Sequence, residues 1–102
     1  IKLYVGEFSN IPVEVVANYV REKMQTNEVR AISTTDGKRS TFIIGVGEGV
    51  IKNIKATEIV KALEQQVQGK GGGSPSTARV SLPSEYATKA AEIIRQTVID
   101  AI

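Results

Sequence analysis

Hydrophobic and polar positions alternate at the beginning of the chain and then take on a helical period. Residues 1–5 alternate, which is the pattern of a half-buried β-strand. Pro12 suits the first turn of a helix, and apolar residues then recur at intervals of three and four positions from Val13 to Met24. A strand and then an amphipathic helix are therefore predicted for this part of the chain.

Two further strands are predicted on either side of a tight turn. Asp36-Gly37 is a strong hairpin signal, because both residues tolerate a positive φ, and it separates residues 29–35 from residues 40–46. Residues 42–46 are nearly all apolar, which predicts a central strand. The glycines at positions 45, 47 and 49 then indicate a turn that leaves the sheet.

Two more helices are predicted around a glycine-rich segment. Apolar residues recur at helical spacing from Ala56 to Val67, and Gly69 is a natural C-terminal cap for that helix. Residues 69–83 form the only long irregular segment, a predicted glycine loop. Residues 83–85 suit the first turn of a last helix, predicted for residues 84–102.

The resulting order is strand, helix, strand, strand, helix, glycine loop, helix. This mixed order predicts an α+β fold, with a sheet of at least three strands and helices packed on one face of it. The length of 102 residues fits one domain. In this domain, residues 1–68 supply the sheet and two helices, residues 69–83 the loop and residues 84–102 the last helix.

Composition and charge favour binding over catalysis. The chain has no cysteine and no histidine, which excludes thiolate chemistry, cysteine metal sites and the commonest general base. No pair of side chains forms a nucleophile with a fixed base. Residues 37–89 carry eight basic and four acidic side chains, whereas each flanking segment carries one more acidic than basic side chain. This basic middle fits an anionic partner, although a small excess of charge is also ordinary for a solvated surface.

The glycine loop is the main candidate site. Gly71, Gly72 and Gly73 leave backbone N–H groups open to an anion, and Lys70 adds a positive charge. Arg79 reaches the same ligand if the loop folds back. From the residues alone, a binding loop and a flexible hinge are about equally favoured, because the segment matches neither a P-loop nor a dinucleotide fingerprint.

Other residues near the loop support the site less strongly. Lys52 and Lys55 precede the second helix and extend a basic edge toward Lys70, or are simply solvated. Tyr86 is better explained by packing under the loop than by stacking on a base. Lys38 and Arg39, beside the hairpin turn, are expected to be solubilising only. Aromatic residues make up 5% of the chain, too few for a base-stacking platform.

One stretch of sequence resembles a known family. A Lys-Ala pair, Lys55-Ala56, begins the second helix, and residues 69–78 read G-K-G-G-G-x-P-x-x-A. This combination resembles the C-terminal domain of alanyl-tRNA synthetase, called C-Ala, which belongs to the DHH-associated group that is also found in DHH phosphoesterases. Ser74-Pro75 follows the glycines where the phosphoesterases commonly have a histidine, which favours the synthetase. The sequence departs from the family after residue 78 and in its long last helix.

The resemblance implies a function in translation. Such domains bind the elbow of tRNA and help the aminoacylation and editing centres of the parent ligase act on one tRNA-Ala. The RNA-binding residues expected here are Lys70, Gly71, Gly72 and Gly73, flanked by the following cations: Lys52, Lys55 and Arg79. No cofactor is expected in this domain, since ATP, magnesium and zinc would be bound in other domains of a parent enzyme.

The expected partners are tRNA-Ala, other domains of the parent and a second copy bound through the last helix. The chain starts with Ile1 rather than methionine, so we expect it to be part of a longer protein. A cytoplasmic location and no membrane partner are also expected. Two alternatives stay open. One is a substrate-binding domain of a DHH-family phosphoesterase that recognises nucleotides or oligonucleotides, and the other is a dimerisation module.

Overall fold

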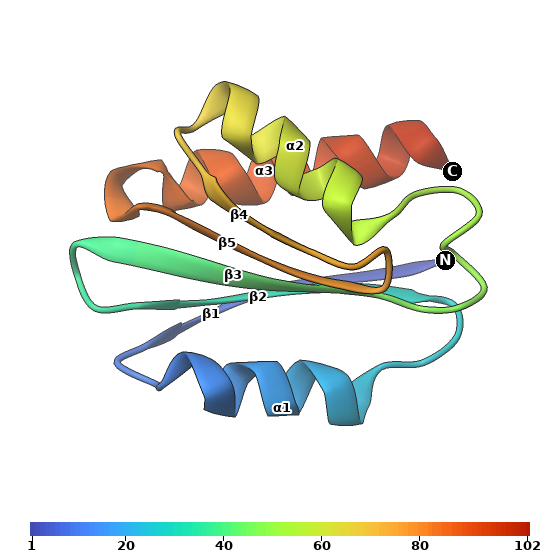
Figure 1. Cartoon of the computed structure of the whole chain (residues 1–102), viewed down its shortest axis with the longest axis horizontal. Coiled ribbons are helices and arrows are strands. Elements are labelled where there is room, and N and C mark those ends of the chain that lie inside the picture. Colours follow the sequence, from blue (N-terminus) through green and yellow to red (C-terminus); the bar gives the residue numbers. More distant parts are fainter.

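The computed structural model describes residues 1–102 and contains five strands and three α-helices (Figure 1). The strands are β1 (Lys2–Ser9), β2 (Glu28–Thr35), β3 (Arg39–Val46), β4 (Lys70–Gly73) and β5 (Thr77–Pro83). The helices are α1 (Val13–Lys23), α2 (Ala56–Gln66) and α3 (Ala87–Ala101), and a short 3₁₀ turn at Ser84–Tyr86 precedes the last one. The predicted α+β class is confirmed, as are the three helices and the first three strands.

The five strands form one sheet in the order β1-β2-β3-β5-β4. Only the pair of β1 and β2 is parallel, and α1 makes the crossover connection that a parallel pair requires. The turn at Asp36-Gly37 joins β2 and β3 as an antiparallel hairpin, and Gly37 has a φ of +96°. β3 lies in the middle of the sheet, which confirms the prediction of a central strand for residues 42–46.

The helices cover both faces of the sheet, so the prediction of a single covered face was wrong (Figure 1). α1 packs on one face, and α2 and α3 pack on the other. The reason lies in β2 and β3, which are apolar on both sides. Ile32 and Ile43 belong to the small core beneath α1, whereas Ala31 and Ile44 belong to the large core beneath α2 and α3.

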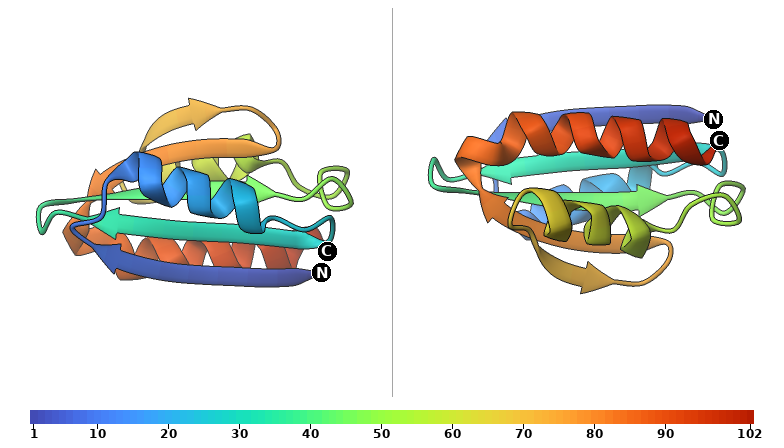
Figure 2. Two further views of the ribbon diagram at one scale, coloured as in Figure 1. Left: turned by 90° about the horizontal axis from the view of Figure 1, so that it is seen from below. Right: turned by 90° about the horizontal axis from the view of Figure 1, so that it is seen from above.

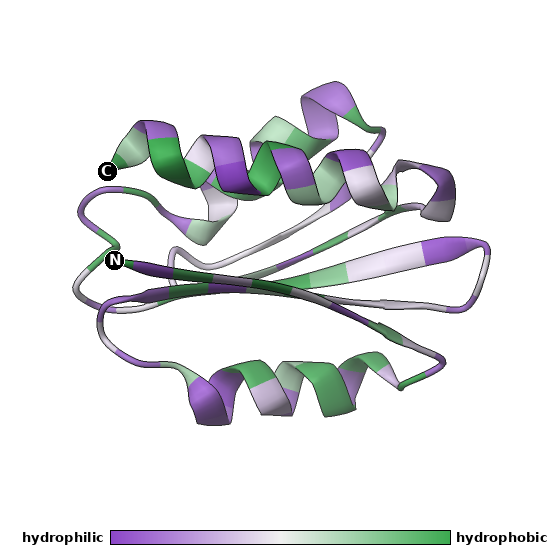
Figure 3. Ribbon diagram, turned by 180° about the vertical axis from the view of Figure 1, so that it is seen from behind, coloured by the Kyte–Doolittle hydropathy of each residue, from purple (hydrophilic) through white to green (hydrophobic).

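The two cores differ greatly in size. The larger contains 19 buried residues and joins the sheet to α2 and α3. The smaller contains five: Val16, Ala17, Val20, Ile32 and Ile43. Green and purple alternate around the helices in Figure 3, as expected when one side of each helix meets the sheet and the other meets water.

α1 is too narrow to cover its whole face. It packs on β2 and β3 and leaves β4 and β5 uncovered on one side, as the left view of Figure 2 shows. Its close approach to β3 depends on Gly45, since a Cβ there would lie 2.9 Å from the Sδ of Met24 and from a methyl group of Val20. The residues of β4 and some of β5 are accordingly exposed.

The predicted glycine loop is largely a β-hairpin. Lys70–Gly73 and Thr77–Pro83 pair as antiparallel strands, and the Ser74 N–H donates to the carbonyl oxygen of Thr77 across the turn, at 2.8 Å. Three glycines in a row have no side chains to show a strand's alternation, so the sequence pattern did not reveal β4. The alternation of β5 is present in Ala78, Val80 and Leu82, which are all buried in the large core.

The end of α2 also differs from the prediction. Gln68, not Gly69, adopts the positive φ after the helix, at +57°. The Gly69 N–H donates to the carbonyl oxygen of Leu63 at 3.3 Å, and a Cβ on Gly69 would lie 2.8 Å from a methyl group of Val80. Glycine is therefore needed at position 69 for close packing and not for capping.

No helix in the structure has the length and apolar character needed to cross a membrane.

Candidate anion-binding face

The open half of the sheet beside α1 carries the polar side chains of β5. Ala78, Val80 and Leu82 point into the large core, so the residues between them point to the opposite face. Arg79 is exposed there and Ser81 is partly exposed, because the body of α1 lies over β2 and β3 and not over β5. The alternation of one strand thus directs a positive charge and a hydroxyl onto the open face.

The strand register adds Lys70 to the same face. Lys70 is paired with Ser81, and Gly72 with Arg79. Since directly opposed residues of an antiparallel pair point to the same side, the Lys70 side chain shares the open face with Arg79. Lys70 and all three glycines of β4 are exposed. The structure therefore brings together five predicted site residues: Lys70, Gly71, Gly72, Gly73 and Arg79.

Arg39 also belongs to this face, although its position in the sequence predicted only a solubilising role. Its Nε donates to the Ser81 Oγ at 3.1 Å, and its guanidinium borders the same hollow as Lys70. Gln68, Gly69 and Pro83 also line that hollow, and Glu64 of α2 adds one carboxylate to it. The pairing of β3 with β5 brings Arg39 here, and no short-range sequence signal reveals that pairing.

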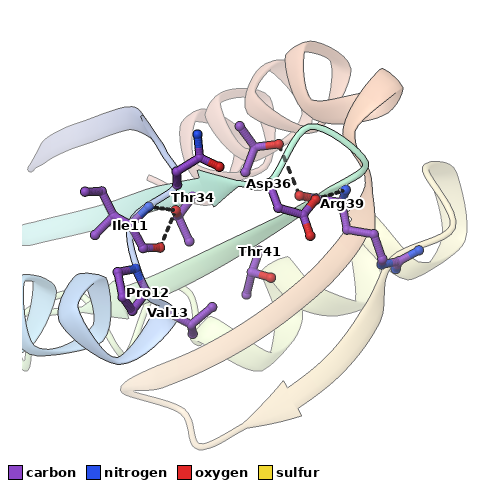
Figure 4. A pocket seen from close by; sticks show the side chains of 9 residues that line it. Ile11, Pro12, Val13, Thr34, Asp36, Arg39 and Thr41 are labelled. Atoms are coloured by element: carbon purple, nitrogen blue, oxygen red, sulfur yellow. Dashed lines mark hydrogen bonds between the residues drawn. The ribbon is translucent and has the colours of Figure 1, made fainter.

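The turn next to Arg39 aims its side chain toward β5. The Asp36 carboxylate accepts hydrogen bonds from the backbone N–H groups of Lys38 and Arg39, both at 2.9 Å, and these bonds lower the pKa of Asp36. The carboxylate is thus engaged by the backbone, and Figure 4 shows the Arg39 side chain extending away from it. Arg39 consequently reaches Ser81 without a side-chain ion pair in the turn.

The polar groups of the pocket in Figure 4 hold the fold together. It lies between the start of α1 and the ends of β2 and β3. Its most buried polar group, the Thr34 hydroxyl, donates to the Ile11 carbonyl oxygen at 2.6 Å and accepts from the Ile11 N–H at 3.2 Å. These two bonds fix the chain as it passes from β1 to α1, and we assign no ligand to this pocket.

Arg79 is the one cation of the open face that has an acidic partner. Its Nη1 lies 2.7 Å from the Glu14 Oε1 on α1. This hydrogen bond and the charge of Arg79 lower the pKa of Glu14, and the same contact raises the pKa of Arg79. The Arg79 side chain is 45% exposed and that of Glu14 is 71% exposed, so the ion pair is bathed in water and contributes little to stability.

The three glycines of β4 have different spatial requirements. A Cβ on Gly71 would overlap the carbonyl oxygen of Arg79, and one on Gly73 would overlap that of Thr77. A Cβ on Gly72 would meet no atom within 4 Å. Glycine is therefore required by the fold at positions 71 and 73, while at position 72 it only leaves the surface flat.

Lys52 and Lys55 are not gathered with Lys70. Lys55 precedes α2 and lies near the hairpin tip, because the Ala56 N–H donates to the Pro75 carbonyl oxygen at 2.8 Å. Lys70 follows the other end of α2, and a helix of 11 residues is about 16 Å long. Lys52 is exposed in the turns before α2. Lys55 therefore lies toward the far end of the hairpin from Lys70.

Tyr86 is partly buried at the start of the last helix. It contacts the large core, and its hydroxyl accepts a hydrogen bond from the Gln68 Nε2 at 3.2 Å. No cluster of three or more aspartate, glutamate, histidine or cysteine residues could hold a metal ion in this structure. The chemistry available on the open face is that of cations, hydroxyls and backbone amides, which suits the binding of phosphate groups.

The chain is similar to a family of domains and to curated proteins of known name. The sequence model of the DHHA1 domain matches residues 2–100. The chain is 27% identical over 81 residues to an alanine–tRNA ligase of Ehrlichia ruminantium, covering 79% of this chain, and 30% identical over 81 residues to that of Francisella tularensis, covering 78%. It spans only 9% of the length of either relative.

Solved structures show the same fold. The C-Ala domain of the Aquifex aeolicus alanyl-tRNA synthetase superposes with a TM-score of 0.80 at 21% identity, covering 94% of this chain and 89% of that domain. A structure described as the DHH domain of a member of a ribosomal protein family superposes with a TM-score of 0.59 at 13% identity, covering 86% of this chain and 20% of the other. Because the family match extends over nearly every residue, the chain belongs to the DHHA1 domain family.

Proposed function

We propose that this chain is the C-terminal, tRNA-binding domain of an alanyl-tRNA synthetase. The proposal is carried by the open face on which Arg39, Lys70 and Arg79 lie beside the glycine strand β4. It is supported by the alanine–tRNA ligases among its relatives and by the fold that it shares with a C-Ala domain. The parent protein would then be a cytoplasmic ligase, and its ATP, magnesium and zinc would be bound in other domains.

The open face would bind the sugar–phosphate backbone of the RNA. Lys70 and Arg39 contact phosphates from the hollow between them, and the flat surface at Gly72 allows a sugar–phosphate chain to lie close to the sheet. Sequence-independent contacts of this kind select a shape, and the elbow of tRNA is a shape that a straight RNA helix lacks. Lys55, near the hairpin tip, and Lys52, in the turns before α2, would contact the RNA farther along. By holding the elbow, the domain would help the aminoacylation and editing centres act on one tRNA-Ala.

The test is a titration of the domain with folded tRNA-Ala at low and moderate salt. An acceptor-stem minihelix that lacks the elbow is the matched control. We expect binding to the tRNA and not to the minihelix, with log affinity falling against log salt at a slope of roughly −1.5 to −3.5 for two to four phosphate contacts. Equal binding to both RNAs would contradict elbow recognition, and binding to neither would contradict an RNA-binding function.

The phosphoesterase alternative predicts that small ligands bind better than a large folded RNA. A substrate-binding domain of that class would prefer nucleotides or short oligonucleotides to folded tRNA. The lower TM-score of the DHH-domain structure, 0.59 against 0.80, makes this the second candidate. Competition between tRNA-Ala and a short oligonucleotide for the same domain would decide between the two.

A dimer through the last helix has less surface available than the sequence suggests. Most of the apolar stripe of α3 is buried in the large core, including Ala90, Ile94 and Val98. Ile99 remains 57% exposed on α3 and is the large apolar side chain that this helix offers to a second copy. Sedimentation of the domain before and after an Ile99→Lys substitution would test this proposal.

A further inference from the structure

An ion pair connects α1 to the open face of the sheet. Arg79, in the middle of β5, donates to the Glu14 carboxylate in the first turn of α1, 65 residues away in the sequence. The other ion pair of the structure, between Glu28 and Arg30, lies within one strand. The contact between Glu14 and Arg79 is therefore the only salt bridge between two elements of the fold.

The surroundings of this ion pair are open to solvent. Gly72, which is paired with Arg79, offers no side chain on that side, and a Cβ at this position would touch nothing. Lys70 extends the same face by two residues along β4. A ligand could thus reach the Arg79 guanidinium across Gly72 without any movement of the backbone.

We propose that Glu14 occupies the place of a phosphate on Arg79 in the free domain, and that a phosphodiester group of the bound RNA displaces it. Carboxylate and phosphate both accept charge-assisted hydrogen bonds from guanidinium, so one can replace the other. Exchange costs little, because an exposed ion pair contributes little free energy. This inference rests on the proposed RNA-binding function and adds a residue that opposes binding.

This exchange would make the face select an RNA backbone over isolated phosphate groups. A single phosphate group competes with a carboxylate that α1 keeps next to Arg79. An RNA backbone already bound at Lys70 and Arg39 presents its next phosphate at a high effective concentration and can displace Glu14. The ion pair would therefore weaken binding to isolated phosphates more than binding to a backbone that spans the face.

The experiment is a comparison of Glu14→Gln with the unsubstituted domain in binding to tRNA-Ala. We expect Glu14→Gln to bind about three- to tenfold more tightly. We also expect its salt slope to stay close to that of the unsubstituted domain, because Arg79 contacts the same phosphate in both once Glu14 is displaced. Glu22→Gln is the control, since it removes the same charge from an exposed position of α1 where no ion pair forms.

Arg79 must be present for this gain to appear. In an Arg79→Ala background, Glu14→Gln should increase affinity no more than Glu22→Gln does. A gain that persists without Arg79, or equal gains for Glu14→Gln and Glu22→Gln, would overturn the displacement and leave only a general effect of charge.

Failure of the inference can be told apart from failure of the proposed function. If the unsubstituted domain binds tRNA-Ala and Glu14→Gln changes nothing, only the displacement is wrong. If the unsubstituted domain binds neither tRNA-Ala nor the minihelix, both proposals are wrong. A carbon-detected NMR titration gives an independent readout, because displacement by tRNA-Ala should raise the lowered pKa of Glu14.

Discussion

The three consecutive glycines of β4 differ in whether the fold leaves room for a side chain at their position. Gly71 and Gly73 leave room for carbonyl oxygens of β5, so the pairing of the two strands depends on them. Gly72 has free space around its missing side chain. The fold does not require residue 72 to be small, and this residue lies on a face with three cations. The close approach of a ligand best explains why it is glycine.

This difference gives a prediction for two substitutions that are neighbours in the sequence. Gly71→Ala should lower the free energy of unfolding by about 1–3 kcal/mol, because its methyl group forces β4 away from β5. Gly72→Ala should leave stability within about 0.5 kcal/mol of the parent and still weaken tRNA binding. Urea unfolding and RNA titration of both variants would check this, and full affinity in Gly72→Ala would show that no backbone lies there.

A buried carboxylate makes the stability of the domain depend on pH. Glu28 is almost fully buried and accepts from the Arg30 Nε at 2.9 Å, and Arg30 in turn lies over the ring of Tyr4. The hydrogen bond from Arg30 holds the pKa of Glu28 below its ordinary value, against the opposing effect of desolvation. The ionised form is thus favoured in the folded state.

The sign of the pH dependence follows from that direction. A lowered folded pKa means that the stabilisation is fully present above the ordinary pKa of about 4.3 and is lost as the pH falls through the lower value. Unfolding experiments between pH 7 and pH 2 should show this acid-side loss, and Glu28→Gln should reduce it. A loss of the same size in Glu28→Gln would assign the effect to other carboxyl groups.

At the scale of elements, the last helix is part of the core. Ile93, Ile94 and Val98 are buried against the sheet, so α3 cannot be removed without exposing the large core. Ile94→Ala should lower the free energy of unfolding by about 2–5 kcal/mol. Ile99→Ala on the exposed side of the same helix is the matched control and should cost far less. Equal losses in chemical denaturation would show that α3 does not pack as described.

The predictability of most elements followed the presence of side chains with a clear period. β5 is the exception, because its alternating Ala78, Val80 and Leu82 were predicted as part of the glycine loop. The helices and the first three strands alternate or repeat visibly, so they could be predicted. β4 could not be, because three glycines carry no pattern and because its only partner is a strand farther along the chain. Arg39 was missed for a related reason: its place beside Ser81 depends on the pairing of β3 with β5, which no local signal predicts. Helices on both faces could have been expected from the unbroken apolar run in residues 42–46.

At the scale of the whole molecule, the cations divide between the two sides of the sheet. Arg39, Lys70 and Arg79 lie on the side of α1, whereas Lys89 lies on α3 on the other side. Lys70→Ala should weaken tRNA binding several-fold and flatten the salt slope by about 0.9, since one phosphate contact is lost. Lys89→Ala, with the same change in net charge, should do neither. Unchanged affinity and slope in Lys70→Ala would remove that residue from the binding face.

The two ends of the chain lie at the same end of the molecule (Figures 1 and 2). Residues 1–36 contain β1, α1 and β2, and residues 37–102 contain every other element, so the backbone joins these two parts only at the turn that includes Gly37. A circular permutant that begins after that turn, with a short linker between Ile102 and Ile1, would retain every strand pair of the sheet. The pairing of the strands therefore does not depend on the order in which the ribosome synthesises the two parts.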